Sequence, residues 1–242
     1  MPQSTLRVVA IGGGTGLATL LRGLKQYVHA EGPWAITDLS AIVTVTDEGG
    51  SSGMLRREFG VLPPGDIRNC IVALAEEELI LSQLFSYRFD SQSTLHGHSL
   101  GNLLLTALTD LRGGFFNAIR DASEVLAIRG RIYPSTLSDV RIRAVLDNGA
   151  ELVGEREISG DKLSDLAPPK HSRIRELRLE PEDVVPLDEA IAEIEQADLI
   201  LIGPGSLYTS VLPNLLIKGL REALSSARAL RIYVCNVMTQ PG

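Results

Sequence analysis

The stretch Leu6-Arg7-Val8-Val9-Ala10-Ile11-Gly12-Gly13-Gly14-Thr15-Gly16 decides the fold. An apolar run ends in a glycine loop, and leucines then recur at helical spacing. A buried strand, a glycine turn and an amphipathic helix direct backbone N–H groups at a phosphate, and the helix N-terminus adds roughly half a positive charge. The loop therefore predicts phosphate or nucleotide binding, and a tight turn that needs only small residues is the alternative. The predicted contact residues are Gly12, Gly13, Gly14, Thr15 and Gly16.

Composition limits the class of protein. The chain has 242 residues, 44% of them hydrophobic, which is enough for one large α/β domain with a sizeable core. Its formal net charge of −7 argues against nonspecific binding of nucleic acid, which depends on clustered positive charge. No apolar run is long enough to span a bilayer, and residues 1–5 lack the apolar core of a signal peptide. Cys70 and Cys235 are expected to be buried free thiols in a reducing cytoplasm, without zinc-site spacing.

The order of the patterns predicts the architecture. Strands are expected at about 6–11, 39–45, 199–202 and 231–235, and helices at about 15–28, 187–196 and 214–227. Residues 76–130 are helical in pattern, with a stripe of leucines, and residues 131–158 turn to β with a hairpin turn at Asp147-Asn148-Gly149. The fold class is therefore α/β: a Rossmann-like three-layer parallel sheet with an inserted helical subdomain and a β-hairpin excursion. We expect a single domain over residues 1–242, with residues 162–186 irregular.

A long polar stretch, Thr46 to Gly65, follows the second strand, and ordered loops of this length are usually functional. Asp47 is positioned to hold a divalent cation or a sugar hydroxyl. The serines and glycine amides after it can donate to phosphate oxygens, although a flexible surface turn is the alternative. Arg56 is a candidate guanidinium contact to phosphate, or a solvated arginine. The predicted site residues here are Asp47, Gly50, Ser51, Ser52 and Arg56.

Three further polar clusters open helices or follow strands. Asp66 is either a plain N-cap or, with Asp47, the second oxygen ligand for Mg²⁺. His96 and His98 lack a third zinc ligand, so hydrogen bonding by His98 and Asn102, or N-capping by Ser99, is the better interpretation. A glycine loop follows the strand at 199–202, without the Gly-x-Ser-x-Gly form of a hydrolase. The site residues predicted here are Asp66, Asn69, His98, Asn102, Gly203, Pro204, Gly205 and Ser206.

These clusters converge if the strands are parallel, because ligands of open α/β sheets bind at the carboxyl ends of the strands. The sequence therefore predicts one pocket for a diphosphate, with Asp47 and Asp66 as the metal ligands. No catalytic residue is assigned, because neither a nucleophile nor a general base can be identified. Mg²⁺ is the cofactor that the residues allow, and no organic cofactor is assigned.

Six motifs in order resemble the gluconeogenesis factor (YvcK-like) family, which belongs with the 2-phospho-L-lactate transferases in a CofD-like superfamily. They are Gly12–Gly16, Thr44–Gly53, Pro63–Cys70, His98–Asn102, Gly203–Ser210 and Tyr233–Gly242. The resemblance implies a cytoplasmic protein that binds nucleotide sugars such as UDP-N-acetylglucosamine and acts in cell shape and cell-wall synthesis during gluconeogenic growth. It also implies, from the transferase branch, that aspartates similar to Asp47 and Asp66 hold a divalent metal.

The chain departs from the family pattern at three points. Glu48 stands where the family commonly has a second aspartate, and Met54 stands where it commonly has arginine. Family members typically continue for dozens of residues beyond the motif that ends at Gly242. The first departure keeps the charge, and the second removes a candidate phosphate contact.

Three functions are compared. A regulatory protein that senses a UDP-sugar is the leading hypothesis, with cell-wall synthesis proteins as expected partners. The alternative is an Mg-dependent 2-phospho-L-lactate transferase-like enzyme with a nucleotide-activated donor, although a chain with 5% aromatic residues offers no evident platform for a deazaflavin acceptor. An NAD(P) oxidoreductase lacks an evident acid or base for hydride transfer. The sequence leaves base specificity, sugar specificity and the formation of a homo-oligomer open.

Overall fold

The computed structural model describes residues 6–76, 79–90, 92–160 and 172–237. Its centre is a sheet in the order β3-β2-β1-β7-β8, in which every neighbouring pair is parallel. The predicted Rossmann-like parallel sheet is therefore confirmed. Its strands are β1 (Leu6–Gly12), β2 (Ile36–Val43), β3 (Arg131–Pro134), β7 (Leu199–Ile202) and β8 (Leu230–Tyr233).

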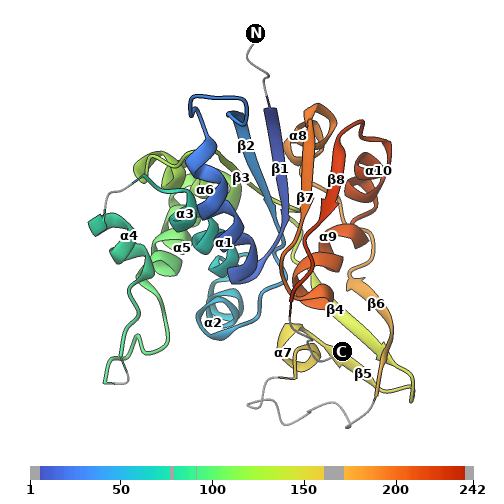
Figure 1. Ribbon diagram of the computed structural model, residues 1–242. Coiled ribbons are helices and arrows are strands. Elements are labelled where there is room, and N and C mark those ends of the chain that lie inside the picture. Colours follow the sequence, from blue (N-terminus) through green and yellow to red (C-terminus); the bar gives the residue numbers. More distant parts are fainter. Residues whose placement is uncertain (1–5, 77–78, 91, 161–171, 238–242) are drawn as a thin grey trace.

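Helices cover both faces of this sheet (Figure 1). From β1 the chain proceeds outward to β2 and β3, and it then returns to place β7 on the other side of β1. The order of the strands therefore reverses between β1 and β7, and ligands of open α/β sheets bind outside the carboxyl ends at such a point. One face carries α1 (Gly14–Leu24), α3 (Gly65–Leu74), α5 (Leu100–Arg112) and α6 (Phe115–Val125), and the other carries α8 (Asp188–Gln196) and α10 (Lys218–Ser226).

The first strand is buried because helices cover both of its faces. Val8, Val9, Ala10 and Ile11 are each at most 1% exposed, which explains why the sequence is continuously apolar there and does not alternate. The leucines of α1 pack on it, and Leu17 and Leu21 are completely buried. Further short helices in the connections between these elements are η1 (Lys25–Tyr27), α4 (Leu79–Ser86), η2 (Leu207–Val211) and α9 (Leu212–Leu216).

A small antiparallel sheet lies beyond the carboxyl ends of the parallel strands (Figure 1). It consists of β4 (Arg141–Leu146), β5 (Glu151–Val153) and β6 (Ile174–Glu180), in the order β5-β4-β6. The alternating apolar residues of β4 are buried, and Leu146 N donates to Ala150 O across the predicted hairpin turn. The short helix α7 (Glu155–Ile158) follows β5 and faces the parallel sheet's carboxyl edge.

Several boundaries differ from expectation. The stretch 46–65 is not a continuous loop, because α2 (Gly50–Phe59) occupies its middle. Its mixture of glycine, serine and arginine carries little helical signal, and burial of Leu55 stabilises the helix instead. Residues 162–186 are not all irregular, because β6 pairs with β4, while 162–171 lie outside the described residues. Asp66 is not the N-cap of α3, since Pro64 occupies that position and Asp66 lies in the first turn.

Residues 79–125 contain α4, α5 and α6, but the helical pattern expected over 76–130 is wrong for the described residues between Ser86 and Leu100, which form turns. The leucine stripe of α5 is also not its buried face. Leu104 is 38% and Leu111 77% exposed, while Leu105 is fully buried. The polar residues on the buried side have hydrogen-bond partners, Asn102 with Arg68 of α3 and Thr106 with the Asn102 carbonyl of its own helix, so they are buried at small cost. Cys70 is buried as expected, but Cys235 is exposed. Among the described helices none is long and apolar enough to cross a membrane.

Candidate functional site

A cavity of about 530 Å³ opens at the carboxyl edge of the parallel sheet, beside the junction of β1 and β7. The glycine loop after β1 forms one wall, and the loop after β7 forms the second. The third wall comes from α7 of the small sheet. Two predicted loops are therefore brought together, as the parallel topology requires. The lining residues are Gly13, Gly14, Thr15, Gly16, Glu155, Ser159, Gly205, Ser206, Thr209, Ser210, Asn236 and Val237.

The glycines of the first loop are required by close packing and by backbone conformation. A Cβ at Gly13 would lie 2.6 Å from Thr44 Cγ2 and 2.8 Å from Asp66 Oδ2. A Cβ at Gly16 would lie 2.6 Å from Pro204 O, so the two glycine loops contact each other through their backbones. Gly14 has φ +65, a region that other residues rarely adopt. Gly13 is the N-cap of α1, which places the helix N-terminus at the cavity.

Side chains from two segments hold the loops in register. Thr46 Oγ1 donates to Thr209 O at 3.3 Å, which links the loop after β2 to η2. Asn214 is fully buried, and its Nδ2 donates to Gly12 O and Ser210 O. Gly12 and Pro204 therefore support the cavity from behind and do not line it. Gly203 is also buried behind the second loop.

Three carboxyl groups meet beside the glycine loop. Asp47 follows β2, Asp66 lies in the first turn of α3, and Glu155 begins α7. The side chain of Glu155 hydrogen-bonds with that of Asp47, and the Gly14 backbone N–H donates to Asp66. A Cβ on Gly65 would collide with the Asp47 carboxylate and lie 2.4 Å from Ser52 Oγ, so Ser52 also lies in this cluster.

This crowding raises the pKa of two of the carboxyls. Burial, followed by the charge of Asp47, raises the pKa of Asp66 to about 7. Burial, followed by the charges of Asp47 and Asp66, raises the pKa of Glu155 to about 9. Burial also raises the pKa of Glu48, although Arg141 and Arg56 oppose that shift. In neutral solution the cluster therefore retains protons that isolated carboxylic acids would release.

The donor set fits a hard cation such as Mg²⁺, which takes one or two carboxylates and fills the rest of its shell with water and phosphate oxygens. No lysine or arginine is among the cavity's lining residues, so a cation would have to offset the charge of any bound phosphate. Within the described ranges, no group of three or more His, Cys, Asp and Glu side chains has the arrangement of a metal site by itself. The residues therefore fit a cation that is shared with an anionic ligand.

Several predicted contacts lie away from the cavity and are bound to protein groups. His98 is buried, and its Nδ1 lies 3.2 Å from Ser51 Oγ. Asn102 Oδ1 and Asn69 Oδ1 both accept from Arg68, at 2.9 Å and 2.6 Å. Ser99 caps α5, with its Oγ accepting from Asn102 N. The hydrogen-bonding interpretation of this cluster is therefore confirmed.

Arg56 and Gly50 also do not line the cavity. The guanidinium of Arg56 donates to Val140 O at 2.8 Å and pairs with Asp139, at the start of the small sheet. Its side chain is only 5% exposed, so it is not the solvated arginine that the sequence allowed. Gly50 is exposed and begins α2.

Sequence reasoning missed Glu155 and Ser159 as cavity residues. Nothing around them marks a site, because they reach the cavity only when the small sheet folds back over the carboxyl edge. Three other cavity residues that were not predicted lie in polar clusters that follow strands: Thr209, Ser210 and Asn236. Their place after a strand is a signal from which they could have been predicted.

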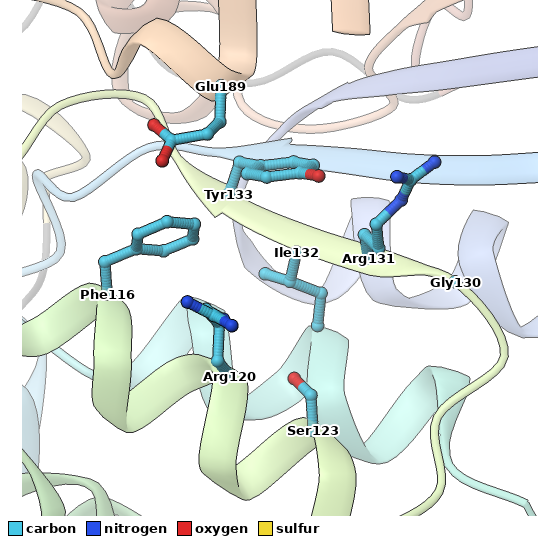
Figure 2. Close-up of a pocket in the computed structure, with 8 residues that line it drawn as sticks. All are labelled: Phe116, Arg120, Ser123, Gly130, Arg131, Ile132, Tyr133 and Glu189. Atoms are coloured by element: carbon cyan, nitrogen blue, oxygen red, sulfur yellow. The ribbon is translucent and has the colours of Figure 1, made fainter.

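A second cavity of about 350 Å³ lies at the lateral edge of the sheet, along β3 (Figure 2). Phe116, Arg120 and Ser123 of α6 form one wall, and Glu189 of α8 lies across the strand from them. The rings of Phe116 and Tyr133 are 5.9 Å apart. None of the predicted site residues lies here, so the lateral cavity is separate from the glycine-loop cavity.

Comparison with known proteins identifies the family of this chain. Residues 8–242 match the family model described as 2-phospho-L-lactate transferase CofD. The chain belongs to this family. A relative from Nostoc sp., described as a gluconeogenesis factor, is 52% identical over 98% of this chain, which spans 48% of that relative's length. The gluconeogenesis factor of Bacillus subtilis is 46% identical over 98% of this chain, which spans 69% of that protein.

A solved structure confirms the fold. The crystal structure of a protein from Bacillus halodurans superimposes with a TM-score of 0.88 at 45% sequence identity. The match covers 99% of this chain and 71% of that one. The predicted family resemblance is therefore confirmed, and the chain spans about half to two thirds of the length of its relatives.

Proposed function

We propose that this CofD-family chain binds a nucleoside diphosphate sugar, with UDP-N-acetylglucosamine as the candidate, together with a divalent cation, and acts as a regulatory protein. The observation that carries the proposal is the cavity itself. Two glycine loops and the N-terminus of α1 offer backbone donors to phosphate oxygens, while acidic groups lie beside them and no basic side chain lines the cavity.

The cation follows from the balance of charge. A pyrophosphate next to Asp47, Asp66 and Glu155 would be repelled unless a positive ion lay between them. Asp47 and Asp66 would hold Mg²⁺ on the protein side, and phosphate oxygens and water would complete its shell. When bound, the cation supplies charge neutralisation and orientation of the diphosphate.

A regulatory role is favoured over turnover by what lines the cavity. Its side chains are Ser, Thr, Asn, Val and Glu, and no aromatic ring among the lining residues could stack on a deazaflavin acceptor. The relatives at 46–52% identity are described as gluconeogenesis factors. The proposal therefore extends to cell shape and cell-wall synthesis during gluconeogenic growth, in the cytoplasm and through protein partners of that pathway.

The second candidate is an Mg-dependent phospholactate transferase. The paired aspartates beside a phosphate loop favour it, as does the description of the matching family. In that reaction Asp47 and Asp66 would hold the cation, which would neutralise the charge of a nucleotide-activated donor's diphosphate.

Calorimetry separates the two candidates. UDP-N-acetylglucosamine and a GMP-activated 2-phospholactate, the donor that the transferase would use, are titrated with and without Mg²⁺, and the mixtures are then analysed for nucleotide products with a deazaflavin acceptor present. Saturable, Mg²⁺-dependent binding of the UDP-sugar without turnover supports the regulator. Release of GMP with acceptor present supports the transferase, and absence of binding to either nucleotide would refute both.

A further inference from the structure

The connection between the parallel sheet and the small sheet passes through a half-buried acidic side chain, Glu48. Its Oε1 lies 3.8 Å from Arg56 Nη1 and 3.4 Å from Arg141 Nε. Arg56 belongs to α2 and Arg141 begins β4, so one carboxylate joins two guanidiniums from different parts of the fold. Because Arg56 is buried, it needs this negative charge nearby.

The same residue contacts the beginning of α7 in two ways. Its carboxylate lies so close to Gly154 that a Cβ at that position would collide with it. Its backbone N–H donates to Glu155 Oε2 at 3.1 Å. Gly154 is the N-cap of α7 and Glu155 its first residue, so Glu48 contacts the two residues at which the cavity's third wall begins.

Glu48 also follows Asp47 directly in the sequence, and Asp47 belongs to the carboxyl cluster beside the glycine loop. Asp47 contacts α7 directly through the hydrogen bond with Glu155, and Glu48 adds a second connection, held by the guanidiniums on one side and by Gly154 and Glu155 on the other. The length of the Glu48 side chain matters. Aspartate is one methylene shorter, so its carboxylate would not reach the two guanidiniums and Gly154 at their present distances.

We propose that Glu48, held by Arg56 and Arg141, is a positioning residue that sets the distance between the glycine-loop wall and the α7 wall of the cavity, and so determines how Glu155 and Ser159 meet the ligand. This inference rests on the proposed function for its effect on affinity. Its effect on the placement of α7 is independent of any ligand.

The test compares Glu48→Gln, Glu48→Asp and the control Arg143→Gln. Glutamine keeps the shape and removes the charge, whereas aspartate keeps the charge and shortens the side chain. Arg143 lies on the same small sheet, where it pairs with Glu151 and Glu180 at 2.6 and 2.8 Å, away from the cavity. The control therefore disturbs the small sheet's ion pairs without touching the connection.

The first measurement is the methyl NMR signal of Ile158, a buried residue of α7, in the protein without ligand. Both Glu48 variants should displace this signal, while Arg143→Gln should leave it in place. An unmoved Ile158 signal in both Glu48 variants would overturn the inference, whatever the ligand does.

The second measurement is the Kd of UDP-N-acetylglucosamine with Mg²⁺. We expect Glu48→Gln to weaken binding about tenfold and Glu48→Asp about threefold. The aspartate effect is smaller because aspartate keeps the charge and therefore part of the contact with both guanidiniums. Arg143→Gln should stay within about twofold. A displaced Ile158 signal with unchanged Kd would overturn the part of the inference that concerns affinity. If the wild-type protein does not bind the UDP-sugar, the proposed function fails, and the NMR result still decides the positioning role.

Discussion

The glycine-loop cavity and the lateral cavity are lined by different kinds of chemical group. The glycine-loop cavity at the carboxyl edge is lined by backbone, small polar side chains and the acidic Glu155, from four separate segments. The lateral cavity along β3 is lined by aromatic and long charged side chains from α6, β3 and α8 (Figure 2). Backbone donors at a helix N-terminus suit phosphate, whereas the side chains at β3 mainly bind one another.

The polar groups of the lateral cavity illustrate this difference. Tyr133 donates from its hydroxyl to Glu193 Oε1 at 3.0 Å, and Ser40 donates to the other oxygen of Glu193. Arg131 pairs with Asp38 and with Glu193. These groups hold β3 to α8, so we interpret the lateral cavity as a consequence of packing at the sheet's edge.

The largest expected effect comes from adding a side chain to the glycine loop. Gly14→Val should weaken binding of the UDP-sugar more than about a hundredfold, because the new side chain enters the phosphate position and the backbone at φ +65 disfavours it. The fold should persist, as measured by circular dichroism. Gly149→Val is the matched control, since Gly149 has φ +84 at an open hairpin turn with no atom near its Cβ position. Equal affinity in both variants would remove the loop from the site.

The second effect tests the cation. Asp47→Asn should reduce affinity for the UDP-sugar about thirtyfold in the presence of Mg²⁺ and should abolish the difference between measurements with and without Mg²⁺. Asp121→Asn on α6, near the lateral cavity, removes a carboxylate that pairs with Arg112 and should change neither quantity. Retained Mg²⁺ dependence in Asp47→Asn would show that the cation is held elsewhere.

The third effect is a dependence on pH. The raised pKa values of Asp66 and Glu155, about 7 and about 9, mean that Mg²⁺ must displace protons to bind. Apparent Mg²⁺ affinity, measured by calorimetry with the nucleotide present, should therefore tighten by up to about tenfold per pH unit between about pH 6 and about pH 8. Affinity that is flat across this range would contradict protonation of the cluster.

The same pKa shifts predict how stability depends on pH. A carboxyl whose pKa is raised on folding stabilises the folded state fully below its unfolded value of about 4, and this contribution is lost as pH rises through the folded value. Without Mg²⁺, the Tm of the wild type should fall by several degrees relative to Asp66→Asn between about pH 5 and about pH 8. Parallel Tm curves for the two proteins would refute this assignment.

The smallest effect is expected at the lateral cavity. Arg120→Ala should leave the Kd of the UDP-sugar within about twofold and the Tm nearly unchanged, because Arg120 is exposed on α6. Phe116→Ala should lower the Tm by a few degrees through loss of its contact with Tyr133, again without changing the Kd. A large loss of UDP-sugar affinity in either variant would show that the two cavities are coupled.

Local patterns in the sequence determined the parallel sheet, the glycine loops and the carboxylates that follow strands. Val8 to Ile11 and Leu199 to Ile202 are continuously apolar because helices cover both faces, and the glycines after them are needed where backbones touch. The residues that make up each of these patterns lie close together in the chain, so the patterns can be recognised in the sequence alone. The pairing of Asp47 with Asp66 was predicted from their places after a strand and at the start of a helix, and the family resemblance implied the same pair.

Only the tertiary structure decided which side chains share the cavity. Glu155 comes from a sheet that folds back over the carboxyl edge, and Arg56 turns away from the ligand cavity to support that sheet. The leucine stripe of α5 faces outward in part because Asn102 on the opposite side has a buried partner in Arg68. Contacts between distant segments depend on how whole elements pack, and no local pattern of residue types records that packing.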